Sequence, residues 1–402
     1  MDLHPDASDP DEPHGGTPPS VSDVRSILEG VLDPELKASI VELGMVRDVA
    51  VDPDGRVEVA VALTTSGCPL RAQIQRDVES KVGSLPGVSH VRVRYGEMSA
   101  AEKAKLMDRA RWAARENAPP TEVLATTRVL AIASGKGGVG KSSVTVNLAV
   151  ALAQRGHRVG ILDADVWGFS VPRLLGSSDR LRGSEGKIEP NEVEIPGPGS
   201  LSVVSMGFLV ETEDTALMWR GLILARAVEQ FLTDVRWGEL DYLLIDMPPG
   251  TGDVQMALTR LLPQAEMLVV TTPARNAQKV AQRVADMARR SHMKVLGVVE
   301  NMSGFVAPDG TQHAIFGEGG GAELARAIDV PLIGTVPIEP LVATSGDEGA
   351  PAVLAHPDAP AAQAFTAIAA HIAEDLMPPV EMAGCTARMM ALIDAAVGDA
   401  SS

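Results

Sequence analysis

The sequence has few cysteines and few aromatic residues. Its two cysteines, Cys68 and Cys385, stand far apart among 402 residues. Together with the absence of a secretory signal, this argues against a structural disulfide and predicts a cytoplasmic protein. Aromatic residues make up 3% of the chain, so its 45% hydrophobic content must pack mainly through Val, Leu, Ala and Ile.

Positive charge and long apolar runs are also scarce. Lys and Arg total 35 against 53 Asp and Glu, which gives a formal net charge of -18. Non-specific nucleic-acid binding depends on neutralising phosphates, so we expect no nucleic-acid partner. No apolar run approaches the ~18 residues that a membrane-spanning helix needs, so we expect no membrane partner.

One segment carries more information than any other part of the chain. Residues 135–142 read GKGGVGKS and fit the phosphate-loop pattern G-x-x-x-x-G-K-S/T, between an apolar run at 128–134 and a helical pattern. In that setting, backbone N–H groups and a helix N-terminus bind phosphate, whereas the alternative is a Gly-rich turn without a ligand. The flanking patterns favour a nucleotide site formed by Gly135, Lys136, Gly137, Gly138, Val139, Gly140, Lys141, Ser142 and Ser143.

The two lysines of this segment have different expected roles. Lys141 is expected to bridge the β- and γ-phosphates of ATP, and the hydroxyl of Ser142 to bind Mg²⁺. Lys136, directly after the first glycine, makes the segment resemble the deviant Walker A loop K-G-G-x-G-K-S/T. In that family two subunits meet face to face and this lysine reaches the partner's nucleotide, so the resemblance implies a homodimer.

Two acidic motifs follow predicted strands. Asp246 ends the apolar run 242–245 in the Walker B arrangement that holds Mg²⁺. Asp163 and Asp165 end another run, and we expect Asp163 in the outer Mg²⁺ shell and Asp165 to orient the attacking water. A solvated loop is the alternative for any one of these aspartates. The predicted catalytic residues are Lys136, Lys141 and Asp165, and the predicted Mg²⁺ ligands are Ser142, Asp163 and Asp246.

Composition and periodicity divide the chain into five parts. Residues 1–20 are rich in Pro, Gly and Asp and are expected to be disordered. Residues 21–97 predict a small α/β domain, with helices at 21–32 and 70–82 and strands at 57–63 and 88–95. Residues 98–127 are expected to form a helical linker, and residues 379–402 a C-terminal tail.

The largest part, residues 128–378, alternates between strand-like and helical patterns. This alternation predicts an α/β fold whose mostly parallel sheet is covered by helices on both faces, as in P-loop NTPases. Ligands in such sheets bind at the carboxyl ends of the strands. The strand-like runs are at 129–133, 158–162, 242–245, 267–271, 295–300 and 332–336.

Several segments of this part resemble the Mrp/ApbC family, whose members are iron–sulfur cluster carrier ATPases. The resemblance implies ATP hydrolysis, transfer of clusters to client apoproteins and contact with iron–sulfur scaffold proteins. In related ATPases an Asn after one strand and a Pro-containing loop after another border the adenine, which implies this role for Asn301 and Pro337. Besides the phosphate loop, the matching segments are DADVWGFSVPRLL (163–175), MWRGL (218–222), WGELDYLLIDMPPGTGD (237–253), ENMS (300–303), IFGEGGG (315–321) and residues 330–340.

The first domain resembles the small domain of iron–sulfur assembly factors such as SufT. The resemblance rests on DPEL (33–36), SIVELGMV (39–46) and LTTSGCP (63–69). In that domain the cysteine of the T-x-x-G-C-P turn is the suspected reactive position, which implies Cys68 as a candidate cluster ligand. A helix that starts directly after it would lower the pKa of the thiol. A small buried cysteine with no ligand role is the alternative.

The sequence departs from the Mrp/ApbC pattern where a cluster is normally held. Family members usually carry a C-x-x-C pair just after ENMS, through which two subunits share a 4Fe–4S cluster, but residues 303–313 contain no cysteine. Four thiolates normally hold such a cluster. His313 is a candidate substitute, although a lone loop histidine is more often solvated, and Cys385 is expected not to be a ligand. Whether this chain carries a cluster stays open.

Three other functions compete with the cluster carrier. A family member that has lost cluster binding could act as a regulatory ATPase, and a non-enzymatic module could bind ATP without hydrolysing it. A MinD/ParA-like positioning ATPase shares the phosphate loop, but it needs a basic terminal helix or a basic face. Residues 379–402 contain one Arg and no Lys, which argues against that alternative.

Overall fold

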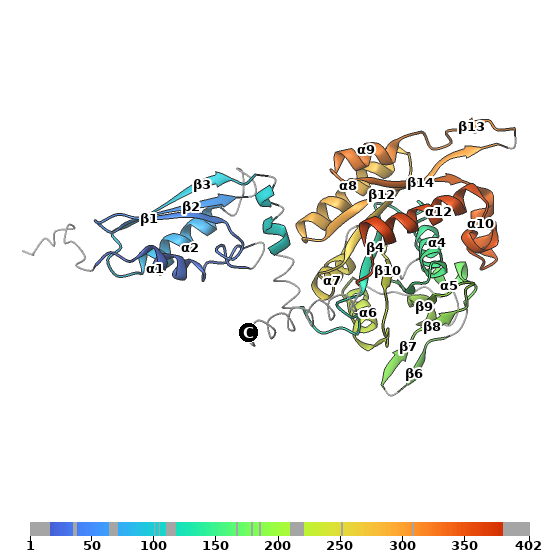
Figure 1. Ribbon diagram of the computed structural model, residues 1–402, viewed down its shortest axis with the longest axis horizontal. Helices are drawn as coiled ribbons and strands as arrows, with labels where there is room; N and C mark the ends of the chain where they lie inside the picture. The colour runs from blue at the N-terminus through green and yellow to red at the C-terminus, as the bar shows by residue number, and fades with distance from the viewer. Residues whose placement is uncertain are drawn as a thin grey trace, which may run out of the picture. The chain divides into compact units, whose positions relative to one another are not determined.

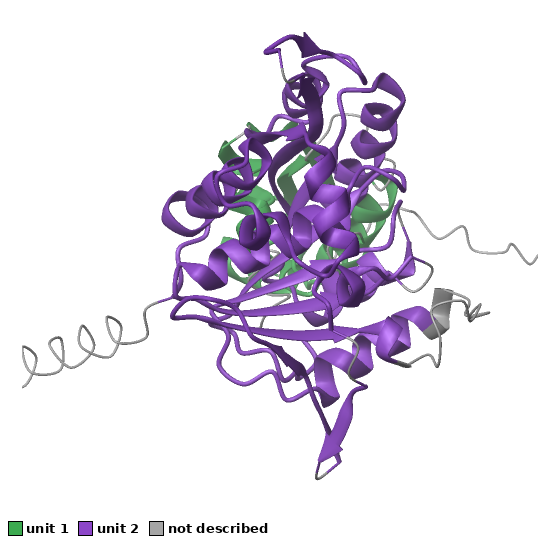
Figure 2. Ribbon diagram, turned by 90° about the vertical axis from the view of Figure 1, so that its right-hand side faces the viewer, with its two compact units in different colours: residues 1–117 green, residues 118–402 purple. Residues whose placement is uncertain are grey.

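The computed structural model of the protein divides into two compact units, residues 1–117 and residues 118–402, which Figure 2 shows in different colours. The described residues are 17–34, 38–63, 71–99, 101–103, 105–109, 118–165, 168–177, 180–184, 186–209, 221–250, 252–307 and 309–380.

The first unit is a three-stranded sheet with two helices packed against it (Figure 1). The central strand pairs antiparallel with the first strand and parallel with the third. Its residues Val57, Val59 and Val61 are buried in the same core as the helices, because alternate side chains of a strand share one face. The elements are α1 (Val21–Leu28), β1 (Val46–Val51), β2 (Arg56–Leu63), α2 (Arg71–Gly83) and β3 (His90–Glu97).

Three local features of this unit differ from the sequence predictions. Helix α1 ends four residues earlier than predicted, at Leu28, before a turn that contains Gly30. Ser20, predicted to be disordered with the rest of 1–20, caps α1 through its side chain, whereas residues 1–16 lie outside the described residues. Strand β1 was not predicted, because a bulge between Val46 and Asp48 interrupts its alternation of buried and exposed residues.

The segment predicted as a helical linker, 98–127, is divided between the two units. Residues 101–103 and 105–109 are helical, but residues 118–127 contain no helix and belong to the second unit. Within 118–127, the backbone N–H of Glu122 donates to the carbonyl of Leu232 at 2.8 Å. The Thr127 hydroxyl donates to the Leu240 carbonyl at 3.0 Å. These contacts, rather than helical periodicity, fix the start of the second unit.

The second unit alternates strands with helices, as predicted (Figure 1). All six predicted strands are present, as β4, β5, β10, β11, β12 and β14. Its elements are β4 (Arg128–Ser134), α4 (Lys141–Gln154), β5 (Arg158–Asp163), α5 (Val171–Leu174), β6 (Arg182–Ser184), β7 (Lys187–Glu189), β8 (Asn191–Val193), β9 (Ser200–Ser205), a 3-10 turn (Met206–Leu209), α6 (Gly221–Asp234), β10 (Tyr242–Asp246), α7 (Asp253–Leu261), β11 (Glu266–Thr271), α8 (Arg275–Arg290), β12 (Lys294–Val306), β13 (Gln312–His313), α9 (Gly320–Ala327), β14 (Leu332–Ile338), α10 (Pro340–Asp347), α11 (Ala352–Ala355), α12 (Pro360–His371) and a π-helical turn (Ile372–Leu376).

The main sheet has nine strands in the order β13-β12-β11-β4-β10-β5-β9-β8, with β14 also paired to β12. Its central pairings are parallel, and the short edge strands β8 and β13 pair antiparallel. The phosphate loop leaves from β4, near the middle of the sheet, next to β10. The carboxyl ends of β4, β5 and β10 therefore meet at one place, where the sequence predicted the nucleotide site.

Helices cover both faces of this sheet. Along β10, Tyr242 and Leu244 pack on the face covered by α4 and α12, whereas Leu243 and Ile245 pack on the face covered by α6 and α7. Both faces of the strand are buried, which explains why it reads as a continuous apolar run. The predicted α/β fold class is confirmed.

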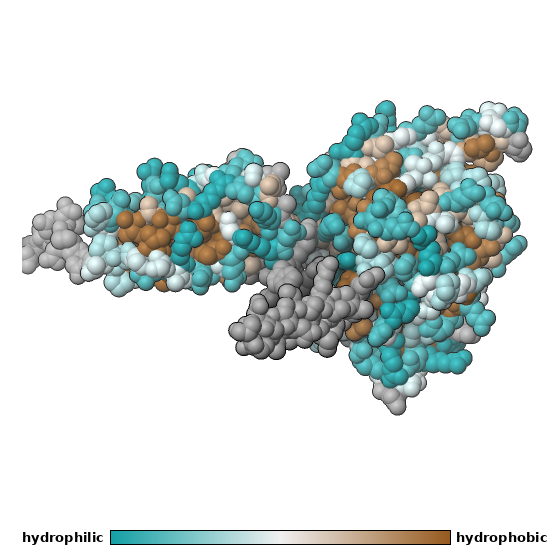
Figure 3. Space-filling model, in the orientation of Figure 1, coloured by the Kyte–Doolittle hydropathy of each residue, from teal (hydrophilic) through white to brown (hydrophobic). Residues whose placement is uncertain are grey.

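Hydrophilic residues dominate the surface seen in Figure 3, with scattered hydrophobic areas. The large hydrophobic side chains that stay exposed include Met256, Ile315 and Phe316. Among the described residues, no helix has both the length and the apolar composition to cross a membrane.

Candidate nucleotide site

The phosphate loop connects the end of β4 to the first residue of α4, Lys141. Gly140 precedes the helix with a φ of 78°, in the left-handed region that glycine adopts without a side-chain clash. Gly135 packs directly on α8, where an added Cβ would lie 2.3 Å from the backbone nitrogen of Ala281. The loop therefore needs glycine at both positions, for different reasons.

A cavity of about 380 Å³ opens beside this loop. Backbone and hydroxyl groups of the loop form one wall, and residues that follow β5 and β10 form the other. The backbone N–H groups, the hydroxyls and the lysine in this lining suit a phosphorylated ligand. The lining residues are Ser134, Lys136, Gly137, Gly138, Gly140, Lys141, Ser142, Ser143, Asp165, Gly168, Ser170 and Pro249.

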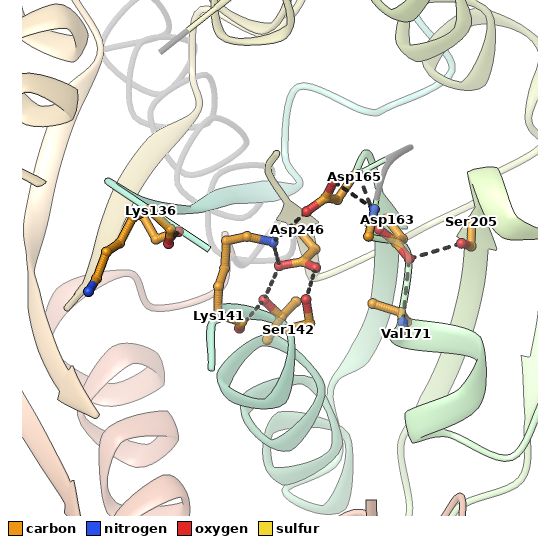
Figure 4. A network of polar contacts seen from close by, with 11 residues as sticks. Lys136, Lys141, Ser142, Asp163, Asp165, Val171, Ser205 and Asp246 are labelled. Atoms are coloured by element: carbon orange, nitrogen blue, oxygen red, sulfur yellow. Dashed lines mark hydrogen bonds and ion pairs between the residues drawn. The ribbon is translucent and has the colours of Figure 1, made fainter. Parts of the chain in front are cut away.

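The carboxylate of Asp246, at the end of β10, accepts hydrogen bonds from polar side chains of α4 (Figure 4). Lys141 donates through Nζ to Oδ1 at 2.7 Å, and Ser142 donates through Oγ to Oδ2 at 2.5 Å. The hydroxyl of Thr145, one turn further along α4, lies 2.9 Å from Oδ1. Asp246 has no exposed surface, so its charge depends on these partners.

Asp163, at the end of β5, is also fully buried. It accepts hydrogen bonds from the Ser205 hydroxyl at 2.9 Å and from the backbone N–H of Asp165 at 3.2 Å. Burial, and then the nearby charge of Asp246, raise the pKa of Asp163 from 3.8 to about 7, although Lys141 and these hydrogen bonds act in the opposite direction. The site thus holds a carboxyl whose charge is costly without a further cation.

Asp165 is the one carboxylate among the described residues that line the cavity. Its Oδ2 lies 3.8 Å from Lys141 Nζ, and its Oδ1 accepts from the backbone N–H of Gly168 at 3.2 Å. Only 7% of Asp165 is exposed. Two carboxylates, Asp165 and Asp246, therefore share a single lysine, an excess of negative charge that a divalent cation would neutralise.

Lys136 and Asn301 lie at the edges of this cluster. Lys136 points away from Lys141 (Figure 4), with its Nζ 3.4 Å from Oδ1 of Asn276 on α8. Asn301 is 7% exposed and donates through Nδ2 to the carbonyl of Val139 at 2.9 Å. The structure brings Asn301 to the phosphate loop, and its contact with adenine stays a prediction.

Pro337 does not lie in a loop, contrary to the sequence prediction. Strand β14 continues through it to Ile338, which pairs with Phe305 of β12. Proline is tolerated there because β14 lies at an edge of the sheet, where one side of the strand needs no hydrogen-bond donor. A role for Pro337 beside the adenine also stays a prediction.

Sequence profiles of two families match this chain. The profile described as NUBPL iron-transfer P-loop NTPase matches residues 125–373, which is more than half of the chain. The chain belongs to this family. A second profile, described as iron–sulfur cluster assembly protein, matches residues 22–94 of the first unit. The resemblance that the motifs suggested is thereby confirmed for both parts of this iron-transfer P-loop NTPase.

Individual relatives agree with the family profile. The chain is 46% identical to a protein of Mycobacterium bovis over 342 residues, which cover 83% of this chain and 88% of that protein. It is 43% identical to a protein of Synechocystis over 352 residues, which cover 87% of this chain and 96% of the relative. Both relatives bear the name iron–sulfur cluster carrier protein.

The candidate cluster ligands of this iron-transfer NTPase are less defined than its nucleotide site. Cys68 and Cys385 lie outside the described residues. His313 is exposed on β13 and stacks on Phe305, with 6.3 Å between the ring centroids. Within the described part of the chain, no three or more His, Cys, Asp or Glu residues are grouped so that they could hold a metal ion.

Three polar residues of the nucleotide site were missed by the sequence analysis. Thr145 could have been found, because it lies three residues after Ser142 and therefore on the same face of α4. Ser170 ends the motif DADVWGFS and lines the cavity. Ser205 gave no signal, because it contributes its hydroxyl from β9, a strand that was not predicted.

Proposed function

We propose that the protein is an ATP-hydrolysing iron–sulfur cluster carrier and assembly factor of the cytoplasm, which transfers clusters to client apoproteins. The observation that carries this proposal is that Lys141, Ser142 and Asp165 line one cavity of an iron-transfer P-loop NTPase, and that the buried Asp246 accepts hydrogen bonds from the first two. The relatives named iron–sulfur cluster carrier proteins support the same conclusion.

ATP and Mg²⁺ fit the residues that are present. The possible metal ligands are the Ser142 hydroxyl and the carboxylates of Asp163 and Asp246, and oxygen atoms of this kind are what Mg²⁺ prefers. When bound, Mg²⁺ neutralises phosphate charge and orients the transferred group. Asp165 and Asp246, which share Lys141, leave a net negative charge that a divalent cation would neutralise.

The protein's own residues supply the remaining parts of hydrolysis. The Lys141 ammonium binds the β- and γ-phosphates, and backbone N–H groups of the loop hold their oxygens. Asp165, on the cavity wall, accepts a hydrogen bond from the attacking water and aligns it with the γ-phosphorus. Asp163 holds the backbone that carries Asp165, because its Oδ1 accepts from the Asp165 N–H at 3.2 Å.

Lys136 supports a homodimer as the active form. Its side chain turns away from Lys141 of its own loop, and its Nζ lies 3.4 Å from the amide oxygen Oδ1 of Asn276. A lysine so placed can reach a nucleotide in a second copy, where its charge would stabilise the transferred phosphate. The sandwich of two loops around two nucleotides is thus part of the proposal.

The cluster is the cargo of this ATPase, and Cys68 is its proposed ligand. We would reconstitute the full chain anaerobically with iron and sulfide, as wild type and as Cys68→Ser, with Cys385→Ser as the matched control. We expect bound iron and charge-transfer absorption in the wild type and the control, and neither in Cys68→Ser. The thiolate is the form of cysteine that ligates iron, and a helix N-terminus favours this form.

The other outcomes separate the alternatives. Loss of iron only in Cys385→Ser would show that Cys385, and not Cys68, is the ligand. No iron in any variant, with ATP hydrolysis intact, would rule out the carrier and leave a regulatory ATPase. A positioning ATPase is less supported, because the family match is to iron-transfer proteins and the chain is acidic.

A further inference from the structure

Helix α8 carries a row of positive charge in a chain whose formal net charge is -18. Arg275, Lys279 and Arg283, which we call the α8 basic row, are exposed and stand four residues apart. Residues at this spacing share one side of a helix. The opposite side of α8 packs into the core through small side chains such as Ala281 and Ala285, so the row faces solvent.

The basic row has no partner in the part of the chain that the structure describes. None of its three cations makes an ion pair there, whereas Arg290 at the end of the same helix lies 3.0 Å from Asp286 Oδ2. In a chain with more acidic than basic residues, intramolecular pairing would have been easy to achieve. The three charges are left available to another molecule.

Helix stability does not explain these three cations. The N-terminus of a helix is its positive end, so Arg275 in the first turn of α8 is unfavourable, and no acidic residue stands in that turn to offset it. Arg275 and Lys279, and then Lys279 and Arg283, are also like-charge pairs at i,i+4, which destabilise a helix. By contrast, Arg289 and Arg290 in the last turn are favoured by the dipole. The basic row is therefore better explained by binding than by folding.

We propose that the α8 basic row is a docking surface for an acidic face of a partner protein. Four helical residues rise about 6 Å, so the row extends over about 12 Å, which is too long for one small anion. An acidic helix with carboxylates at i,i+4 has the same repeat and can pair with all three cations. A nucleic acid or an anionic membrane would also be repelled by the formal net charge of -18 on the whole chain, whereas a local acidic patch need contact only α8.

The test compares two variants with equal change of net charge. Arg275→Gln, Lys279→Gln and Arg283→Gln together remove the row, and the control combines Arg25→Gln, Arg76→Gln and Arg182→Gln, three exposed side chains elsewhere. The probe is a labelled helical peptide with glutamates at i,i+4, measured by fluorescence anisotropy with the full chain, beside its glutamine counterpart. We expect the row variant to bind the acidic peptide about tenfold more weakly than wild type and control, because three charge contacts are lost.

Several results would overturn the proposal. Equal binding by the row variant, or equal loss in the control, would show that the row is not the docking surface. Tighter binding of wild type to duplex DNA or to phosphatidylserine vesicles than to the peptide would assign another class of partner. A lower Tm for the row variant would give the cations a structural role, since removing like-charge pairs should leave the Tm equal or higher.

Cross-linking provides a second readout that needs no triple variant. A carbodiimide joins a lysine amine to a glutamate carboxylate at contact distance, and Lys279 is the one lysine of α8. We expect a Lys279–peptide product by mass spectrometry, and its absence while other lysines react would overturn the proposal. Both readouts are independent of ATP hydrolysis, so failure of the ATPase proposal would be recognised separately.

Discussion

At the scale of single residues, the three carboxylates of the nucleotide site are held in different ways. Asp246 is saturated by hydroxyl and ammonium donors, and Asp163 by donors from three neighbouring segments. Asp165 alone presents its carboxylate to the cavity. We therefore assign the chemistry to Asp165 and the holding of metal and backbone to the other two.

Replacement of Asp165 tests this division. We expect Asp165→Asn to lower kcat for ATP hydrolysis by about 10²- to 10⁴-fold, because an amide cannot accept the proton of water as a carboxylate does. Nucleotide affinity should change little, since Lys141 and the loop amides remain. Phosphate release and nucleotide titration measure the two effects, with the exposed Asp309→Asn as control. An unchanged rate would remove Asp165 from the mechanism.

The buried carboxyl of Asp163 predicts a pH dependence of stability. Because its pKa is raised from 3.8 to about 7, the folded protein keeps a proton that the unfolded chain has lost between these values. The free energy of unfolding should therefore fall as pH rises from about 4 to 7 without nucleotide. Asp163→Asn should flatten this part of the profile, measured as Tm against pH. An equally steep profile in the variant would assign the effect to other groups.

At the scale of elements, the phosphate loop depends on a close contact between two segments far apart in sequence. Gly140 has a φ of 78°, and an added Cβ would lie 2.2 Å from Nδ2 of Asn301, which is in β12. Asn301 in turn donates a hydrogen bond through Nδ2 to the Val139 carbonyl. A side chain at position 140 would disturb both the turn and this hydrogen bond.

Gly140→Ala should therefore weaken both folding and nucleotide binding. We expect a loss of about 1–2 kcal/mol in the free energy of unfolding from the left-handed backbone, and at least about tenfold weaker ADP binding from the displaced Asn301. Gly186→Ala is a matched control, because Gly186 also has a φ of 78° but nothing lies within 4 Å of an added Cβ. It should lose stability and keep ADP affinity. Equal ADP affinity in both variants would contradict the proposed role of the contact.

The sequence predicted elements well where one physical signal dominated. The strands buried on both faces gave continuous apolar runs, so β4, β5, β10 and β11 were found. Motifs at their ends also indicated which charged side chains come together. Elements with irregular pairing were not predicted, such as β1 with its bulge and the last residues of β14 around Pro337. The partners of Asp163 from β9 depended on tertiary contacts that no local pattern records.

At the scale of the whole molecule, the orientation of Lys136 predicts that oligomeric state depends on one side chain. With ATP and Mg²⁺, we expect the wild type to dimerise and Lys136→Ala to remain largely monomeric by light scattering. Hydrolysis should fall about 10²-fold, because a charge that stabilises the transferred phosphate is lost. ADP binding should be retained through Lys141, and Lys105→Ala, an exposed lysine of the first unit, should behave as wild type. A dimeric Lys136→Ala protein would show that the interface forms without this lysine.

The packing of Gly135 on the backbone of α8 has a consequence beyond the shape of the loop. The same helix carries the basic row on its outer side, so α8 lies between the phosphate loop and the surface where a partner protein would dock. If a bound nucleotide changes the affinity for that protein through α8, the docked protein must change the affinity for the nucleotide by the same factor. The nucleotide dependence of partner affinity and the partner dependence of nucleotide affinity would then be two measurements of a single coupling free energy.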